Sequence, residues 1–346
     1  MRFTLSALPV AGPFDEIIDV RAPSEFAEDH LPGAVSLPVL SDGERAQVGT
    51  IYVRQDRFLA RKVGAALVAR NAAAHLEGPL ADRDGGWRPL VYCWRGGQRS
   101  GSFASILDQV GWRVQVLDGG YKAYRAQVSR LLYTQPLALR LVLIDGGTGT
   151  AKTRLLAHLH DAGAQVIDLE DLAGHRGSNF GAVGPQPTQK MFESRLAAQI
   201  TALDPDQPVF VEAESNAIGA IRLPPSLWSA MRGSDVVVVE APLAARARHL
   251  VRAYPDLTAD GRRLADRIER LRGYHSGDRV AAWHDLARNG HYADLAAGLI
   301  EAHYDRRYKH AARGMRAPIG RLRLDDLDDA TLAAAVPRLR ALAGER

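Results

Sequence analysis

The sequence predicts an α/β protein with two parallel-sheet domains and a helical C-terminal region. Three observations support this class. Two separate series of short apolar runs alternate with helical patterns, a short connector at 134–138 ("TQPLA") divides the two series, and the pattern from about 241 onward is mostly helical. Nearly continuous apolar strands spaced by helices are typical of parallel sheets that are covered on both faces.

The first series predicts the N-terminal domain, residues 1–133. Its strands are expected at 14–21 ("FDEIIDVR"), 89–94 ("PLVYCW") and 113–120 ("RVQVLDGG"). Apolar periodicity predicts helices near 56–75, after Ser100 and from Tyr121.

The second series predicts a domain over residues 138–346. We expect its strands at 139–147, 164–168, 208–213 and 235–240, followed by a helical extension over about 241–346 that contains a short strand at 320–324.

Composition restricts the class of protein. The chain has 346 residues, 46% of them hydrophobic, and a single cysteine, which rules out an internal disulfide and any cysteine-cluster metal site. The first residues lack the apolar core of a signal peptide, and no apolar run approaches the ~18 residues of a membrane span. These features predict a cytoplasmic protein without membrane association.

The only cysteine lies in "VYCWRGGQRSGS" (91–102), at the carboxyl end of a predicted buried strand. Open α/β sheets bind ligands at this edge. Glycines let backbone N–H groups turn toward an anion, a helix N-terminus adds partial positive charge, and arginines add full charge. Each effect favours thiolate over thiol, so Cys93 is predicted to be a nucleophile of lowered pKa. The predicted anion loop comprises Arg95, Gly96, Gly97, Arg99 and Ser100.

A second phosphate signature follows the strand "LRLVLID". Residues 146–153 ("GGTGTAKT") match a Walker A pattern in which Ala151 replaces the glycine before the lysine. We expect Ala151 to be tolerated on the assumption that its backbone is helical. The predicted phosphate-binding residues are Gly146, Gly147, Thr148, Gly149, Thr150, Lys152 and Thr153, and Thr153 is also a candidate ligand of Mg²⁺.

Further polar residues follow the next two strands of the second series. "VIDLEDLAGHRGSNFG" (166–181) predicts a loop over the phosphate site, and "VFVEAESN" (209–216) ends a strand with two glutamates that suit a metal-binding or general-base role. The supporting residues are Asp168, His175, Arg176, Ser178, Glu212 and Glu214.

Positive charge is concentrated near the C-terminus. Residues 246–323 contain 17 Lys/Arg against 9 Asp/Glu, interleaved with aromatic residues. Such a segment suits either a phosphate-backbone contact surface or a set of solvated helices, and the sequence leaves both open. The candidate RNA-binding residues are Arg246, Arg248, Arg252, Arg306, Arg307 and Lys309.

Three motifs of the first domain resemble a rhodanese domain in their order and spacing: "DVRAPSEFAEDHLPGAVSLP" (19–38), "CWRGGQRS" (93–100) and "LDGGYKAYR" (117–125). The spacing between Cys93 and Arg99 is also typical of a cysteine-dependent phosphatase, where the arginine binds the phosphoryl group.

Fusion of this domain to a P-loop domain with "HRGSNFG", "FES" and "VEAESNAIG" resembles the bacterial tRNA 2-selenouridine synthase family over essentially the whole chain. The resemblance implies a transferase acting on tRNA with 2-thiouridine at the wobble position. It would geranylate the sulfur with geranyl diphosphate and then replace the geranylthio group with selenium from selenophosphate. Cys93 matches the family's essential cysteine, as a selenium carrier or as an aid to displacement. No tightly bound cofactor is expected, while Mg²⁺ stays open.

Two other functions fit parts of the sequence. A phosphatase or arsenate-reductase-like enzyme would use the first domain alone, and a P-loop kinase or NTPase would use the second with a non-catalytic rhodanese module. Neither accounts for both loops.

Overall fold

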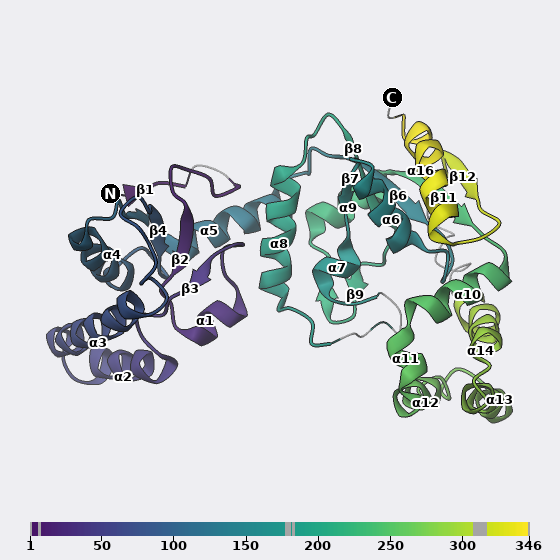
Figure 1. Cartoon of the computed structure of the whole chain (residues 1–346), viewed down its shortest axis with the longest axis horizontal. Helices are drawn as coiled ribbons and strands as arrows, with labels where there is room; N and C mark the ends of the chain where they lie inside the picture. The colour runs from purple at the N-terminus through teal and green to yellow at the C-terminus, as the bar shows by residue number, and fades with distance from the viewer. Residues whose placement is uncertain (1, 6–7, 177–180, 182–183, 307–316, 345–346) are drawn as a thin grey trace. The chain divides into compact units, whose positions relative to one another are not determined.

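The computed structural model describes residues 2–5, 8–176, 181, 184–306 and 317–344. The chain forms two compact units, Met1–Gln135 with Pro187–Ala202, and Pro136–Gln186 with Leu203–Arg346. Figure 1 shows both units, with most of their helices and strands labelled.

The first unit contains a five-stranded parallel sheet in the order β1-β5-β4-β2-β3. Its strands are β1 (Arg2–Phe3), β2 (Glu16–Asp19), β3 (Val35–Ser36), β4 (Pro89–Tyr92) and β5 (Gln115–Leu117). All four residues of β4 are buried, as the predicted strand at 89–94 requires.

The first unit also contains helical elements. They are α1 (Pro23–Glu28), α2 (Asp42–Arg54), α3 (Arg57–Glu77), α4 (Gln98–Val110), α5 (Gly120–Ser129), the π-helical turn η1 (Arg130–Thr134) and α8 (Gln189–Ala202). Polar side chains cap two of them, because Ser41 accepts a bond from Glu44 N–H before α2 and Asp56 accepts one from Leu59 N–H before α3. The core includes Ile18, Val91, Phe103 and Leu107.

Helix α8 lies far along the sequence from the rest of its unit. Glu193 on α8 is 2% exposed and accepts a 2.6 Å hydrogen bond from the Tyr133 hydroxyl of η1. It also pairs with Arg125 of α5. These contacts join α8 to α5 and η1 of the same unit.

The second unit contains another five-stranded parallel sheet, in the order β12-β11-β6-β8-β7. Its strands are β6 (Arg140–Asp145), β7 (Gln165–Ile167), β8 (Pro208–Glu212), β11 (Asp235–Glu240) and β12 (Gly320–Arg323), and β9 (Ala217–Ile218) pairs with β10 (Ile221–Arg222) as a separate hairpin. The short strand predicted at 320–324 is therefore confirmed as an edge of the main sheet.

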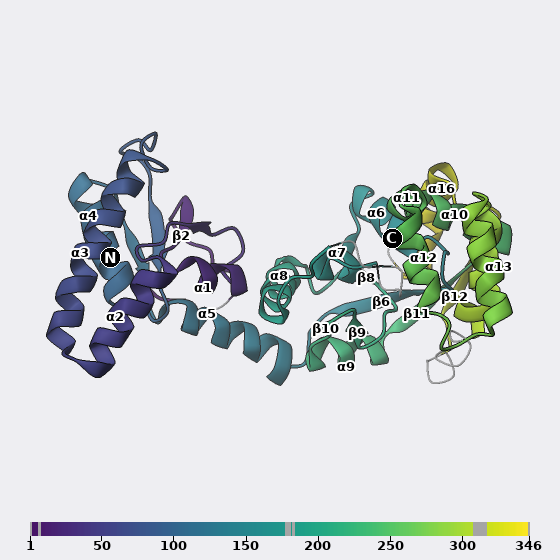
Figure 2. The same cartoon turned by 90° about the horizontal axis from the view of Figure 1, so that it is seen from below.

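The helices of this unit fall into two groups. Near the sheet lie α6 (Lys152–Asp161), α7 (Leu169–Ala173), α9 (Pro225–Gly233) and α16 (Asp329–Leu342). The other group comprises α10 (Leu243–Ala253), α11 (Pro255–Ala259), α12 (Gly261–Glu269), α13 (Gly277–Arg288), α14 (Tyr292–Leu299) and the π-helical turn η2 (Ile300–Tyr304). Figure 2 shows this second group gathered beside the sheet.

The two helix groups have separate apolar cores. Val142, Ile144 and Phe210 of the sheet pack with Leu155 of α6 and Leu332 of α16. A second cluster holds the helical group together through Leu257, Ile268, Val280, Trp283 and Leu295. Both sheets are parallel and the C-terminal region is largely helical, so the predicted α/β class is confirmed. None of the described helices combines the length and the apolar character that a membrane span requires.

Candidate functional site

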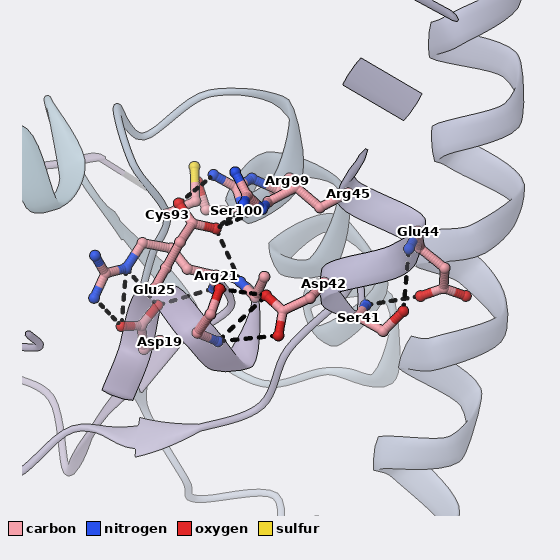
Figure 3. Close-up of polar contacts among 12 residues, drawn as sticks. Asp19, Arg21, Glu25, Ser41, Asp42, Glu44, Arg45, Cys93, Arg99 and Ser100 are labelled. Carbon is pink, nitrogen blue, oxygen red and sulfur yellow. Dashed lines mark hydrogen bonds and ion pairs between the residues drawn. The ribbon is translucent and has the colours of Figure 1, made fainter. Parts of the chain in front are cut away.

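Cys93 lies directly after β4 and before the turn that leads into α4. Its residue surface is 4% exposed, and its Sγ lies 3.1 Å from the Ser100 hydroxyl oxygen in the first turn of α4 (Figure 3). The helix α4 begins at Gln98, two residues earlier than expected. Ser100 therefore lies inside its first turn, where its hydroxyl contacts the thiol.

Local hydrogen bonds set the acidity of this thiol. Burial by itself raises the pKa of Cys93, but hydrogen bonds from the Ser100 hydroxyl and from the backbone N–H groups of Ser100, Arg95 and Gly97 outweigh it. The net result is a pKa below the ordinary value of the thiol. Donors that converge on one sulfur stabilise a thiolate, which is the reactive form of cysteine.

Glycines permit the close approach of backbone segments around the thiol. Gly96 has a φ of +64°, and a Cβ there would lie 2.5 Å from the Leu117 carbonyl oxygen. Gly120 has a φ of +57°, and a Cβ there would collide with the Cys93 carbonyl oxygen. The Cys93 carbonyl also accepts a 2.9 Å hydrogen bond from Tyr121 N–H. The start of α5 therefore fixes residues 93–97, the Cys93 loop. Gly120 was not predicted as a site residue, although "LDGGYK" carries the signal.

The two arginines of the predicted anion loop differ in their surroundings. Arg99 donates a 2.7 Å hydrogen bond to Glu25 of α1, and Arg45 lies 3.8 Å from the same carboxylate (Figure 3). Burial raises the pKa of Glu25, but Arg99 and further donors lower it overall. The side chain of Arg95 is exposed. The role of both arginines toward an anion stays a prediction.

A buried polar network joins residues on either side of the Cys93 loop in the fold. Asp19 pairs with Arg21 at 2.6 Å and accepts a 2.6 Å bond from the Tyr92 hydroxyl. Burial would lower the pKa of Arg21, but Asp19 raises it above its ordinary value. The guanidinium also lies 4.0 Å from the Tyr121 ring centroid, so the residues flanking the loop are held by one network.

In the second unit, residues 146–151 connect β6 to α6. Lys152 Nζ donates a 3.1 Å hydrogen bond to the Gly146 carbonyl, and the Thr150 hydroxyl donates a 2.8 Å bond to the Gly147 carbonyl. Gly149 has a φ of +83°, and a Cβ there would lie 3.1 Å from the Leu250 side chain. The loop lines a cavity of about 470 Å³ at the N-terminus of α6, where a helix favours bound anions.

Our expectation for the backbone of Ala151 is wrong. Its φ of +61° and ψ of +29° place it in the left-handed region. A side chain in this region costs about 1 kcal/mol because its Cβ approaches the following carbonyl. Ala151 is 5% exposed and belongs to the core, so packing compensates for the strain.

Carboxylates gather beside this loop. Thr153 donates a 3.0 Å hydrogen bond to Glu170 of α7, and Glu212 accepts a 3.2 Å bond from Leu169 N–H. Burial, and then the charge of Glu214, raise the pKa of Glu170 to about 7. Burial and the charges of Asp168 and Glu170 raise the pKa of Glu212 well above its ordinary value.

The two glutamates at the end of the strand β8 differ in their burial. Glu212 is fully buried, whereas Glu214 lines the 470 Å³ cavity. Asp168 caps α7 by accepting a 2.8 Å bond from Asp171 N–H, and burial raises its pKa. Glu170 was not predicted as a site residue, although it lies in the motif 166–181, and it links Thr153 to the acidic group.

Arg176 also lines the cavity. It donates a 2.8 Å hydrogen bond to Asp256, and its guanidinium lies 4.8 Å from the Tyr254 ring centroid. Burial, and then the charge of Arg267, lower the pKa of His175. Ser178, the remaining predicted residue of this loop, lies outside the described residues.

The candidate RNA-binding arginines have several different partners. Arg246 is 11% exposed, pairs with Asp305 at 2.6 Å and donates a 2.9 Å bond to the Thr148 carbonyl of the P-loop. Arg248 pairs with Asp326 at 2.7 Å, and Arg252 donates a 3.1 Å bond to the Leu327 carbonyl.

Arg306 lines a separate cavity of about 600 Å³ together with Tyr274, His275 and Arg279. Arg307 and Lys309 lie outside the described residues. A role in RNA binding stays a prediction for all six basic residues.

The contact between Arg246 and the P-loop was not foreseen. Arg246, Leu250 and Tyr254 are spaced by four residues, so they lie along one face of α10 and its end. That spacing was visible in the sequence, but only the fold shows that this face meets the P-loop.

Comparison with known proteins gives two matches to family descriptions. Residues 5–127 match the rhodanese-like domain, and residues 139–276 match the tRNA 2-selenouridine synthase AAA domain. These matches fall on the first unit and on the part of the chain that carries the P-loop.

Three proteins named tRNA 2-selenouridine synthase are similar over much of the chain. The protein of Nitrosomonas europaea is 38% identical over 243 residues, which cover 69% of this chain and 63% of the relative. That of Bdellovibrio bacteriovorus is 38% identical over 252 residues, 69% of this chain and 64% of the relative. That of Shewanella denitrificans is 34% identical over 266 residues, 74% of this chain and 68% of the relative. The chain thus spans slightly less than two thirds of the first two relatives.

Proposed function

The chain belongs to the tRNA 2-selenouridine synthase family, and from this premise we propose that it converts 2-thiouridine at the wobble position of tRNA into 2-selenouridine. The proposed reaction has two steps, geranylation of the sulfur and its replacement by selenium. The observation that carries the proposal is the presence of two loops suited to anions in one chain, one beside a thiol of lowered pKa and one beside a lysine and a cavity.

We assign the geranylation step to the P-loop. The sulfur attacks the first carbon of geranyl diphosphate, a C–S bond forms, the C–O bond breaks, diphosphate leaves and the N3 proton of the base is released. Lys152, the loop N–H groups and the helix N-terminus would stabilise the negative charge that develops on the leaving diphosphate. Arg176 lines the same cavity, and it would add positive charge there by leaving its partner Asp256.

We assign the selenium step to Cys93. Overall, a C–Se bond forms at the base, the C–S bond breaks to release geranylthiol, and water cleaves the P–Se bond of selenophosphate to give phosphate. A thiolate surrounded by N–H donors suits assistance to the displacement at the base, whereas carrying selenium as a perselenide would also need a two-electron oxidant, because the selenium of selenophosphate is at the selenide level. Both roles for Cys93 require the sulfur to be ionised.

Mg²⁺ is a further candidate component. Among the residues that the structure describes, no cluster of three or more His, Cys, Asp or Glu side chains is arranged to hold a metal ion. The Thr153 hydroxyl and the Glu170 carboxylate, 3.0 Å apart, would therefore need phosphate oxygens and water to complete the ligands of Mg²⁺.

One observation argues against a cysteine-dependent phosphatase. In such an enzyme the arginine of the loop binds the phosphoryl group directly. Here Arg99 donates a 2.7 Å hydrogen bond to Glu25, so binding a phosphoryl group would require it to leave a carboxylate. A P-loop kinase or NTPase leaves the Cys93 loop without a use.

The test incubates the purified full chain with tRNA that contains 2-thiouridine, geranyl diphosphate and selenophosphate, and identifies the nucleosides by mass spectrometry. We expect geranylated and then selenated uridine. Lys152→Ala should lower the geranylation rate about 100-fold, because it removes a charge from the leaving group. Lys62→Ala, on an exposed position of α3, is the matched control and should behave as wild type. If neither product forms although the protein binds the tRNA, the proposed function is wrong.

A further inference from the structure

A second cavity of the P-loop unit is lined by apolar and aromatic side chains. It measures about 80 Å³ and lies among α10, α11, α12, α14 and η2. Val251 and Leu295 are among the residues that line this apolar cavity and not the cavity at the P-loop.

The apolar cavity shares lining residues with the 470 Å³ cavity at the P-loop. Thr148, Leu250, Tyr254 and Tyr304 line both. Thr148 belongs to the P-loop itself, so a ligand with its phosphates on this loop has an apolar space immediately beside it.

Contacts of Arg246 fix the two cavities next to each other. Its guanidinium pairs with Asp305, directly after η2, and donates a hydrogen bond to the Thr148 carbonyl. The P-loop, α10 and η2 are therefore joined by one side chain. Gly149 permits the close approach of the P-loop to α10, because a Cβ at residue 149 would lie 3.1 Å from the Leu250 side chain.

We propose that the apolar cavity binds the hydrocarbon tail of a prenyl diphosphate whose diphosphate lies on the P-loop. This inference rests on the proposed function and extends it, because it assigns the part of the site that recognises the tail. A tail gains free energy when it leaves water for such a lining. A nucleoside base would instead bury polar edges with few partners, which is unfavourable.

The size of the cavity indicates how much of the tail it holds. About 80 Å³ is roughly half of the ~150 Å³ cavity that admits benzene in another protein. By the same ratio it accommodates about three carbons, such as the branched end of the tail. The rest of a short prenyl chain lies along Leu250 and Tyr254, between the two cavities.

Calorimetric binding of two probes to the full chain tests the proposal. Inorganic pyrophosphate reports the P-loop alone, and geranyl diphosphate reports the P-loop and the tail. We expect wild type to bind geranyl diphosphate at least about 10-fold more tightly than pyrophosphate, since several carbons leave water.

Val251→Phe fills the apolar cavity, and Val251→Thr keeps its volume but adds a hydroxyl. Both variants should lose most of the preference for geranyl diphosphate over pyrophosphate. Their affinity for pyrophosphate should stay within about twofold of wild type, which also shows that the P-loop is folded. Ala244→Phe is the matched control, because it places the same side chain on an exposed position of α10. It should retain the preference.

Three results would overturn the tail site. The first is equal affinity for the two probes in wild type, and the second is a geranyl preference that both Val251 variants retain. The third is tighter binding of ADP than of pyrophosphate that Val251→Phe abolishes, which would assign the cavity to a nucleoside. Failure of the proposed function is distinct, because then neither diphosphate binds, or Lys152→Ala binds both as wild type does.

Discussion

The Cys93 loop and the P-loop have the same construction and opposite electrostatic settings. Each follows the carboxyl end of a parallel strand, contains glycines and leads into a helix N-terminus. Around Cys93, N–H and hydroxyl donors lower the pKa of a group that belongs to the protein. Around the P-loop, Lys152 lies near carboxyl groups whose pKa values are raised.

The difference shows how one backbone arrangement serves two kinds of chemistry. The first loop stabilises negative charge on its own sulfur, which makes a nucleophile. The second has no nucleophile of its own in the loop, and its raised carboxyl pKa values reduce the negative charge that an incoming phosphate would meet. We therefore expect the two loops to respond differently to substitution.

The largest effect is expected at Cys93. Cys93→Ser should lower the rate of selenation about 1000-fold or more, because a serine hydroxyl remains protonated where a thiolate is needed. Geranylation by the same preparation, measured by nucleoside mass spectrometry, should stay within about twofold of wild type. Equal loss of both steps would contradict the division of labour between the loops.

An intermediate effect is expected at Glu170, beside the P-loop, where protonation makes the free energy of unfolding depend on pH. Burial raises its pKa from 4.5 to about 7 in the folded protein. The folded state then holds the proton more tightly than the unfolded state, so this stabilisation is complete below pH 4.5 and is lost as the pH rises through about 7.

Glu170→Gln keeps a neutral side chain at all pH values. Between pH 5 and pH 8, the free energy of unfolding of wild type should fall by about 2 kcal/mol relative to this variant. Urea unfolding at the two pH values measures the difference, with Glu301→Gln, at an exposed position of the same unit, as the control. The same difference at both pH values would show that Glu170 is ionised in the fold.

The smallest effect concerns backbone strain. In the Cys93 loop the residue with positive φ is Gly96, whereas in the P-loop Ala151 also takes one. Ala151→Gly should stabilise the second unit by about 0.5–1 kcal/mol, because the relief of strain exceeds the added entropy of the unfolded chain.

Urea unfolding measures this effect too, with Ala157→Gly as the control. Residue 157 lies within α6, where glycine should destabilise by about 1 kcal/mol. Destabilisation by both substitutions would mean that the packing of the Ala151 methyl group outweighs its strain.

The sequence by itself determined the two parallel sheets, the order of their main strands along the chain and the positions of both glycine-rich loops. These features depend on local information: apolar runs such as 89–92 form buried strands, and glycines before a helix predict a turn around an anion. The same locality explains why the motifs around Cys93 and Lys152 are sufficient to single out these two residues.

Only the tertiary structure decided which residues meet across long stretches of sequence. It placed α8 with the first unit, paired Arg99 with Glu25, brought Arg246 to the Thr148 carbonyl, and left an apolar cavity beside the P-loop. The left-handed backbone of Ala151 was also decided by the tertiary structure, because its side chain packs in the core. No local pattern encodes these contacts, because each depends on how separate elements pack and on which charges are buried together.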